Sequence, residues 1–306
     1  MKYKIDIFLN KFKQQILNPL RKIWYRLTNY RAERKWFKSA IGYELNLESP
    51  RSFTEKVVWK KINDRNPLLS VTADKYKVRD YIREKLGEQK ASEILIPLIF
   101  ETKNPQRIPF DELPESYVIK ANHGSGKNII IRQETQIDPK EIIRECELWL
   151  HKTHGFHDHQ WAYQQIDRRI LVEDLLTTNS GDIPEDYKFY IFHGNCKLIH
   201  VDFDRFQNHK RSLFTPGWDY VPVRYGYPKG PKEVEPPEKL DEMIKISEKL
   251  GQEFDFVRVD LYELNGEIFF GELTHYPGGG HEKFYSESFD FELGEHWNIE
   301  KEYWKE

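Results

Sequence analysis

The sequence predicts an α+β protein in which two α+β lobes follow a helical N-terminal extension. Strand–turn–strand patterns at residues 117–131 and 254–281 predict a sheet in each lobe, because β-branched and aromatic residues flank glycine-containing turns. Apolar residues at helical spacing before and between these patterns supply the α component. We expect four segments: a basic amphipathic helical extension (1–45), an N-terminal helical or α/β lobe (46–115), a small lobe with a glycine loop (116–172) and a large lobe with a metal site (173–306).

Length and composition limit the classes of function. A chain of 306 residues with a formal charge of −3 can bury a substantial core and does not have the charge of a general nucleic-acid binder. Cys146 and Cys196 provide no disulfide framework, no signal peptide is visible, and no apolar run approaches the ~20 residues that span a bilayer. We therefore expect a cytoplasmic protein, either free or peripheral at the inner face of the membrane.

Positive charge is concentrated in the N-terminal extension. Residues 1–40 hold eleven Lys and Arg against two acids, about +9. Apolar residues recur at near-helical spacing over 3–30, opposite a face of Lys and Arg, with a break at Asn18-Pro19. Two interpretations stay open: a helix packed on the body of the protein, or an interfacial helix that brings residues 1–30 into contact with anionic lipid.

The segment after the extension carries the signals of two helices. Ser52 can cap the first, with Glu55 three residues on, as in a capping box. A second helix opens near Asp74 and ends near Gly87. A short apolar strand at 94–100 and a proline-rich connection follow, which fits a small α/β arrangement.

A second predicted strand ends at a glycine-rich string, residues 122–127, and another strand follows it. Gly124, Ser125 and Gly126 can direct backbone N–H groups toward phosphate oxygens, and Lys120 adds a positive charge. The spacing of a P-loop is absent, as is the third glycine of a Rossmann turn. A phosphate-binding hairpin is one interpretation, and an ordinary hairpin turn with two glycines is the other.

Four histidines fall within nine residues after a predicted helix at 142–150. Their spacing matches no standard zinc pattern and no cysteine is near, so we favour a loop that contacts substrate or solvent over a zinc site.

The large lobe is predicted to open with a strand at 169–176 and a hairpin at 186–201. An amphipathic helix is expected at 240–250. A cationic loop at 202–211 suits a carboxylate or phosphate substrate, with a solvated loop paired to its own acids as the alternative. Its basic residues are Arg205, His209, Lys210 and Arg211.

The strand pair at 254–281 turns at Asn265-Gly266. A two-residue turn there would put Asp260 and Glu272 on opposite faces, because side chains alternate along a strand. A three-residue loop closed by a left-handed glycine shifts the pairing by one residue. We predict the three-residue loop.

This register would place Arg258 opposite Glu272. Asp260 would be diagonal to Glu272, ~7–8 Å away at Cα, which is close enough for two carboxylates to share a cation. Thr274 would lie one step further along the same face. The pattern therefore predicts a metal site on this hairpin.

The triplets R-V-D at 258–260 and E-L-T at 272–274, with the Pro-Gly that follows, resemble the metal-binding end of the ATP-grasp ligases. Over about residues 50–285 the chain resembles the TupA-like (teichuronopeptide-biosynthesis) ATP-grasp family. The strings that carry this resemblance are FTEKVVWKKINDRNPLL, ADKYKVRDYI, VIKANHGSG, DYKFYIFHG, VDFDRFQNHKR and VRVDLYELNGEIFFGELTHYPGGG.

The resemblance implies an ATP-grasp fold, whose two lobes close over ATP, with Mg²⁺ or Mn²⁺ as the metal. It assigns ATP contacts to the glycine loop and to charged residues around it: Lys75, Lys120, His123, Gly124, Ser125, Gly126, Glu173, Asp174 and Lys188. It assigns the metal to Asp260, Glu272 and Thr274, of which the last stands where the family usually has Asn.

We predict catalytic roles for three basic residues. Lys188 resembles the family's basic residue aimed at the triphosphate, Arg258 would face the developing oxyanion, and Arg205 lies in the cationic loop. We predict that the cationic loop binds the acceptor's carboxylate, because it leaves the strand after Lys188 and its cations outnumber the needs of one triphosphate. The substrate-binding residues are expected to be Arg205, His209, Lys210, Arg211 and His275.

The implied activity is that of an ATP-dependent carboxylate–amine ligase, which would join an amino acid or other amine to a uronic acid of a cell-surface glycan or its precursor. Two other classes stay open. A glycosyltransferase using a sugar nucleotide would need a D-x-D triplet, for which Asp202-Phe203-Asp204 is the candidate. A non-catalytic polysaccharide-binding scaffold would use the aromatic residues without the carboxylates.

Overall fold

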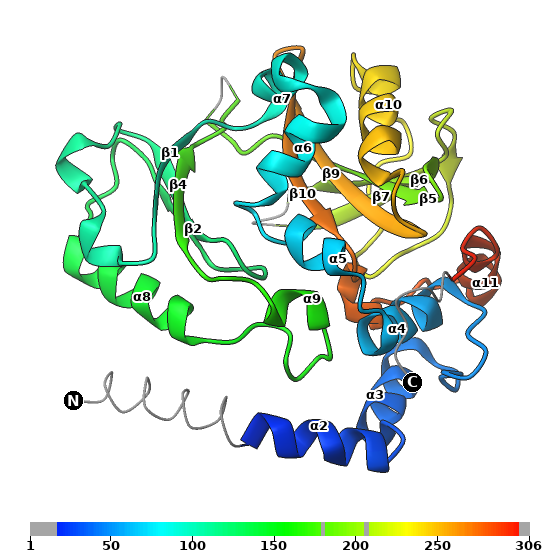
Figure 1. Cartoon of the computed structure of the whole chain (residues 1–306). Helices are drawn as coiled ribbons and strands as arrows, with labels where there is room; N and C mark the ends of the chain where they lie inside the picture. Colours follow the sequence, from blue (N-terminus) through cyan, green and yellow to red (C-terminus); the bar gives the residue numbers. More distant parts are fainter. Residues whose placement is uncertain (1–16, 179–180, 205–207, 300–306) are drawn as a thin grey trace.

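The computed structural model describes residues 17–178, 181–204 and 208–299. Within these residues the strands form two separate antiparallel sheets (Figure 1). The first has the order β1-β4-β2-β3, with bounds β1 Leu98–Thr102, β2 Tyr117–Ala121, β3 Asn128–Ile131 and β4 Ile170–Asp174. The second has the order β10-β9-β5-β6-β7-β8, with bounds β5 Asp186–Phe192, β6 Asn195–Phe203, β7 Lys210–Phe214, β8 Tyr220–Val221, β9 Phe256–Leu264 and β10 Glu267–Thr274.

Helices surround both sheets (Figure 1). The first half of the chain contributes α2 Asn18–Leu27, α3 Arg31–Ile41, α4 Phe53–Asn63, α5 Pro67–Thr72, α6 Val78–Leu86 and α7 Glu88–Ile94. Further along the chain lie α8 Pro139–His151, α9 Trp161–Gln164, α10 Leu240–Gly251 and α11 Glu287–Glu295. Short 3₁₀ turns in the described ranges are η2 Pro105–Arg107, η3 Phe110–Glu112 and η4 Pro277–Gly280.

The small sheet is stabilised by α8, which packs along one of its faces. Cys146 and Trp149 of this helix are buried against Ile119 of β2 and Ile170 of β4. The helix predicted at 142–150 is thereby confirmed. Strand β1, which comes from the predicted N-terminal lobe, pairs with β4 and so belongs to the same sheet as the glycine loop.

The large sheet has one apolar face and one charged face. Helix α10 covers the apolar face, where Met243, Ile246 and Leu250 join the core that contains Ile191 and Val257. This helix is the amphipathic element predicted at 240–250. Because the apolar residues take one face, the alternating residues of β5, β6 and β9 place their charged side chains on the other.

Helix α4 connects the N-terminal part of the chain to the C-terminal end. Phe53 packs against Phe256 and Trp297, so residues from both ends share one core. The predicted capping box is confirmed: Ser52 Oγ accepts from the backbone N–H of Glu55 at 3.1 Å, and Glu55 Oε2 accepts from the N–H of Ser52 at 3.1 Å.

The N-terminal extension is fixed to the body by a buried acid. Glu33 of α3 pairs through Oε1 with Lys61 Nζ of α4 at 2.8 Å and with His281 Nε2 at 2.8 Å. Lys61 is fully buried and also donates to the carbonyl of Gly279 at 2.6 Å. Burial opposes ionisation of Glu33, but His281 and Lys61 lower its pKa to about 2.

The described part of the chain contains no helix that is both long and apolar enough to cross a bilayer. Helix α2 begins at Asn18 with Pro19 in its first turn, while residues 1–16 of the predicted extension lie outside the described residues.

Candidate active site

The β9–β10 hairpin closes with a two-residue turn, so the three-residue loop predicted from the sequence is wrong. Leu264 pairs with Glu267, and Asn265 and Gly266 occupy the turn with φ of 54° and 74°. Two successive positive φ values are typical of a type I′ turn, which matches the twist of the flanking strands.

Asp260 and Glu272 nevertheless face each other, because β10 contains a bulge that the sequence reasoning did not include. The pairing shifts between Phe270 and Glu272, and Gly271 is the extra residue. Beyond it, Glu272 pairs directly with Asp260 and Thr274 pairs with Arg258. The bulge therefore brings together the two carboxylates that the turn alone would have separated.

Only a small residue fits at the bulge. A Cβ on Gly271 would lie 3.0 Å from the carbonyl oxygen of Asp260 and 3.1 Å from Cε2 of Tyr262. Both distances are shorter than ordinary van der Waals contact, so the close approach of the two backbones depends on glycine.

The hairpin continues a charged row across the sheet. Lys188 of β5 pairs with Asp260 of β9, which pairs with Glu272 of β10. Lys188 Nζ lies 3.8 Å from Asp260 Oδ2, 3.3 Å from Asp202 Oδ2, and also forms an ion pair with Asp186. The lysine is buried among three carboxylates.

Arg258 holds Asp260 in a bidentate contact. Its Nε and Nη2 donate to the two carboxylate oxygens at 2.7 and 2.6 Å, and Nη2 also donates to Thr274 Oγ1 at 3.1 Å. The Thr274 hydroxyl donates in turn to Glu272 Oε1 at 3.2 Å. Burial raises the pKa of Asp260 to about 6, against the opposing charges of Arg258 and Lys188.

Lys75 connects this hairpin to the glycine loop. Its Nζ lies 2.9 Å from Glu272 Oε2 and donates to the carbonyl of Gly124 at 3.2 Å. Burial opposes ionisation of Glu272, but Lys75 and Arg258 lower its pKa to about 2. The backbone N–H of Lys75 also donates to the carbonyl of Asn122 at 3.0 Å, which fixes the lysine beside the loop.

The glycine loop is covered by the histidine-rich segment that follows α8. Gly124 has φ +78°, and a Cβ there would lie 2.3 Å from Cγ of His154, so the imidazole is stacked directly over the glycine. His154 in turn makes an edge contact with Tyr163 of α9 at 5.1 Å. Burial and the charge of Glu272 raise the pKa of Tyr163 to about 12, which places its phenol within electrostatic reach of the hairpin carboxylates.

Several cations gather at the glycine loop. Burial and the positive charges of Lys152, Arg168 and Lys75 lower the pKa of Lys127 to about 8. Lys127 Nζ lies 2.9 Å from Nε2 of His123, whose own pKa burial and Lys127 lower to about 3. A cluster of positive charges with a neutral imidazole at its centre favours binding of an anion.

Lys120 and Glu173 lie on one face of the small sheet. Val118 of β2 pairs with Ile130 of β3 and with Glu173 of β4, so these residues share the face that carries Lys120. Lys120 forms an ion pair with buried Glu173, and Arg79 Nη1 lies 3.8 Å from Glu173 Oε1. Asp174 is half-buried, and burial raises its pKa.

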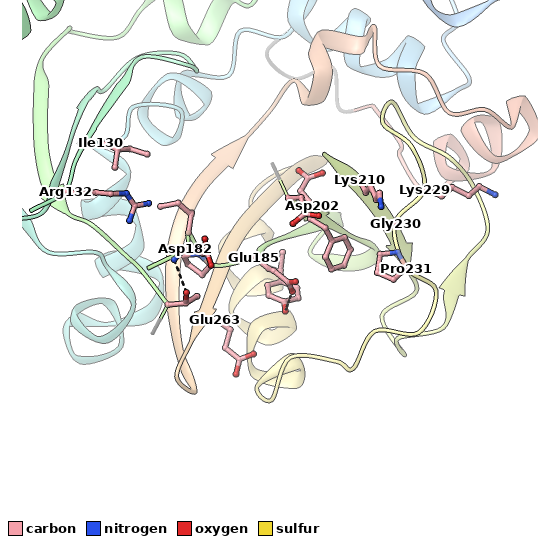
Figure 2. A pocket seen from close by; sticks show the side chains of 16 residues that line it. Ile130, Arg132, Asp182, Glu185, Asp202, Lys210, Lys229, Gly230, Pro231 and Glu263 are labelled. Atoms are coloured by element: carbon pink, nitrogen blue, oxygen red, sulfur yellow. Dashed lines mark hydrogen bonds between the residues drawn. The ribbon is translucent and has the colours of Figure 1, made fainter. Parts of the chain in front are cut away.

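A cavity of about 1380 Å³ opens between the two sheets (Figure 2). Ile130 and Arg132 line it from the small lobe, while Asp202 and Lys210 line it from the large sheet. Since Asp202 contacts Lys188 at 3.3 Å, the cavity reaches the charged row.

Most of the predicted acceptor residues that the structure describes contact other protein groups rather than the cavity. Arg211 is buried, with Nε donating to Asp202 Oδ1 at 2.8 Å and Nη1 donating to Glu282 Oε1 at 2.6 Å. His209 Nε2 lies 2.8 Å from the same Asp202 oxygen. These contacts agree with the alternative of a loop paired to its own acids, whereas Lys210 lines the cavity.

Two other predicted residues have different positions. Arg205 lies outside the described residues. His275 is fully buried, and its Nε2 lies 2.8 Å from Thr72 Oγ1, behind the hairpin. Burial holds its pKa well below the ordinary value. The assignment of these acceptor contacts stays a prediction.

A family model described as TupA-like ATPgrasp matches residues 55–298. The chain belongs to the TupA-like ATP-grasp family. The fold class predicted from the sequence is therefore confirmed, and the matched range includes the glycine loop, the charged row and the β9–β10 hairpin.

Solved structures of ATP-grasp ligases are similar to this TupA-like chain at low identity. D-alanine–D-alanine ligase from Bacillus anthracis complexed with ATP is 17% identical with a TM-score of 0.41, over 69% of this chain and 56% of that one. The ATP-grasp ligase PsnB complexed with minimal precursor is 11% identical with a TM-score of 0.40, over 73% and 60%. Phosphoribosylamine–glycine ligase from Thermotoga maritima is 12% identical with a TM-score of 0.41, over 70% and 50%.

This chain thus spans between half and two thirds of the length of these structures. A search of curated proteins finds no match.

The donor set of the TupA-like hairpin fits magnesium rather than zinc. In the described ranges, no group of three or more His, Cys, Asp and Glu side chains is arranged to hold a metal ion. Mg²⁺ is commonly bound by one or two carboxylates with phosphate oxygens and water completing its six ligands. Asp260 and Glu272 supply such a pair, and the cations Arg258 and Lys75 contact these same carboxylates here.

The structure adds three residues to those that the family resemblance assigned. Lys127 belongs to the string Gly-Ser-Gly-Lys and its position next to the loop was a usable signal. His154 and Tyr163 come from a segment whose sequence gives no sign that it covers Gly124.

Proposed function

We propose that this protein is an ATP-dependent ligase that joins an amine to a carboxylate through an acylphosphate, with release of ADP. The contact of Lys75 with both Gly124 and Glu272 carries the proposal. It brings a phosphate-binding type of loop within one side chain of a carboxylate pair suited to Mg²⁺, which is the arrangement that a bound nucleotide triphosphate requires.

The nucleotide would lie between the two sheets. The cations around Lys127 support placing its phosphates beside the glycine loop, because several positive charges lie close together there. The cavity beside Ile130 is large enough to take the adenosine. Lys120 and Lys188 add charge on either side of that path.

Mg²⁺ held by Asp260 and Glu272 would neutralise the phosphate oxygens and favour transfer of the terminal phosphoryl group. Thr274 would keep Glu272 oriented through its hydroxyl. Arg258 would carry a positive charge at the point where the transferred group meets the acceptor.

The reaction would proceed in two steps, phosphoryl transfer and then amide formation. An acceptor carboxylate oxygen attacks the γ-phosphorus, the bond to the β–γ bridging oxygen breaks, and ADP leaves. The amine then attacks the acyl carbon, inorganic phosphate leaves with the bonding electrons, and the amine gives up a proton as the amide forms. The two lobes serve to hold the three reactants in line and to exclude water from the acylphosphate.

For the acceptor we propose a uronic acid of a surface or capsular glycan, or its precursor, and for the amine an amino acid. Membership of the TupA-like family supports this choice, as does Lys210 at the cavity wall, where a carboxylate would find a cation. The glycosyltransferase alternative has less support, because Asp202 of the D-x-D triplet is engaged by Lys188, His209 and Arg211.

ADP release measured against a matrix of uronic acids and amino acids, with products read by mass spectrometry, tests this function. We expect release that needs ATP, Mg²⁺, a uronic acid and an amine, and a product heavier by the amine less water. Asp260→Asn should lower the rate at least about a hundredfold, because the metal and the phosphates lose their alignment. Asp111→Asn, at an exposed carboxylate far from the hairpin in sequence, is the matched control.

Circular dichroism of both variants distinguishes a chemical defect from unfolding. Full ADP release by folded Asp260→Asn, or turnover of a sugar nucleotide in place of ATP, would overturn the proposal.

A further inference from the structure

Helix α2 exposes its apolar face to solvent. Leu20, Ile23, Trp24 and Leu27 have exposed fractions of 61%, 57%, 53% and 81%. They follow the spacing i, i+3, i+4 and i+7, so they form one continuous row, which we call the apolar stripe. An amphipathic helix of a globular protein normally turns such a row toward the core.

The opposite face of α2 contacts the body. Tyr25 makes an edge contact with His159 at 4.6 Å, and Lys22 Nζ lies 5.9 Å from the ring centre of Phe156. No residue of α2 is buried. Figure 1 shows the helix lying along the outer edge of the molecule, away from both sheets.

The stripe is a local concentration rather than ordinary surface composition. In the described ranges, nine large hydrophobic residues are exposed, and four of them lie in this ten-residue helix. Others, such as Ile99, Ile137 and Tyr285, occur singly on distant elements. Single exposed apolar residues need no explanation. A contiguous row indicates a surface that binds a membrane or another protein.

Positive charge surrounds the stripe. Residues 17–32 contain no acid. Arg21, which is half-buried, and Arg26, which is exposed, flank the stripe, whereas Lys22 lies on the face toward the body. Long cationic side chains beside an apolar row can extend to lipid phosphates while their stems stay on the apolar side.

We propose that α2 docks the protein onto a membrane surface rich in anionic lipid, with the apolar stripe inserted among the acyl chains and the flanking cations at the headgroups. Helices that lie in the membrane–water interface typically carry tryptophan and leucine on one face and Lys and Arg on the other. The sequence repeats the same apolar spacing at positions 5, 8, 9, 12 and 16, which lie outside the described residues.

Vesicle flotation of the full chain tests the docking. The probes are vesicles of phosphatidylcholine alone and vesicles in which one lipid in three is phosphatidylglycerol, each at low and high salt. We expect the protein to float with the anionic vesicles at low salt and to dissociate as salt screens the cations.

Two pairs of variants separate the apolar and charged contributions. Trp24→Ser with Leu27→Ser should lower partitioning at least about tenfold. Arg21→Gln with Arg26→Gln should lower it about tenfold on anionic vesicles and leave binding to neutral vesicles unchanged.

Each pair has a control of the same chemical type elsewhere on the surface. Ile99→Ser with Ile137→Ser removes two exposed apolar side chains, and Lys197→Gln with Lys232→Gln removes two exposed charges. Neither control should change flotation. Because α2 buries no residue, the stripe variants should keep the thermal unfolding midpoint of the wild type.

The proposal is overturned if the wild type does not float with anionic vesicles, or if the stripe pair and its control bind equally. It is also overturned if light scattering shows a dimer that Trp24→Ser with Leu27→Ser dissociates, since a second copy would then cover the stripe.

Discussion

Substitution of the bulge glycine tests whether the backbone geometry of β10 sets the metal site. In Gly271→Ala the new Cβ would lie 3.0 Å from the Asp260 carbonyl oxygen and 3.1 Å from Cε2 of Tyr262. The two strands must separate by a few tenths of an ångström to accept it. The displaced atoms belong to Asp260 itself and to Tyr262 two residues further along β9, so Asp260 moves relative to Glu272 as the strands separate.

The expected cost follows from overpacking between two paired strands. Such insertions cost about 1–3 kcal/mol, while loss of a glycine from the unfolded chain returns ~0.4–1 kcal/mol. Gly217→Ala carries the same unfolded-state effect without the clash, because its nearest neighbours are at 3.6 and 3.7 Å. The difference between the two variants therefore measures the clash alone.

Urea unfolding and calorimetric titration with ATP and Mg²⁺ supply the two readouts. We expect Gly271→Ala to be ~1–3 kcal/mol less stable than Gly217→Ala and to bind the nucleotide about tenfold or more weakly. If both variants match the wild type in stability and in nucleotide affinity, the bulge does not set the spacing of the carboxylates and the reasoning is refuted.

Three further outcomes follow from groups with shifted pKa values or specific caps. The proposed phosphate site needs Lys127 protonated, and burial with the nearby cations lowers its pKa to about 8. The affinity for ATP should therefore fall as pH rises through 8, and Lys127→Met should remove that dependence in calorimetry. The pKa of Glu33 falls from 4.5 to about 2 on folding, so its contribution of ~3 kcal/mol is present above pH 4.5 and is lost as pH falls toward 2. Glu33→Gln should remove this part of the acid sensitivity measured by urea unfolding, because it ends the contacts with Lys61 and His281. Ser52→Ala should lower the free energy of unfolding by ~1–2 kcal/mol through loss of the α4 cap.

These expectations fail under simple conditions. If the affinity of the wild type for ATP does not depend on pH, Lys127 does not contact the phosphates. An unchanged acid-unfolding profile in Glu33→Gln would show that the carboxylate is already protonated or solvated near neutral pH, and an unchanged urea midpoint in Ser52→Ala would show that water replaces the cap.

Local chemistry made much of the fold predictable. Some elements depend on residues near one another in sequence, so spacing alone identifies them. They are the capping box at Ser52, the glycine turn after Lys120 and the amphipathic helix at 240–250. Strand β1 was harder to place. Its pairing with β4 joins residues about seventy positions apart, and no local pattern shows which lobe a lone strand joins.

The hairpin brings Asp260 and Glu272 together although its predicted register was wrong. Arg258, which was expected opposite Glu272, lies opposite Thr274. Alternation requires a three-residue loop if the strands are regular, but a bulge changes the parity of one strand by a residue. Gly271 in a strand was the available signal, since glycine there often marks a bulge.

The cation cluster at the glycine loop could not be predicted from the sequence for a different reason. Lys75, Lys127, Lys152 and Arg168 come from four separate segments and meet only after the chain folds. The same is true of His154 over Gly124. Contacts of this kind depend on tertiary packing, which residue spacing does not encode.

The buried pair between Glu33 and Lys61 makes the catalytic domain dependent on residues outside its family boundaries. The matched range begins at residue 55, so it includes Lys61 and His281 but leaves out the acid that pairs with both. A domain trimmed to those limits would lack the carboxylate that pairs with Lys61, and removal of one partner of a buried ion pair costs about 3–5 kcal/mol. A proteolytic cut between α3 and α4 that released the extension would therefore destabilise the enzyme as well as detach it from any surface that α2 binds.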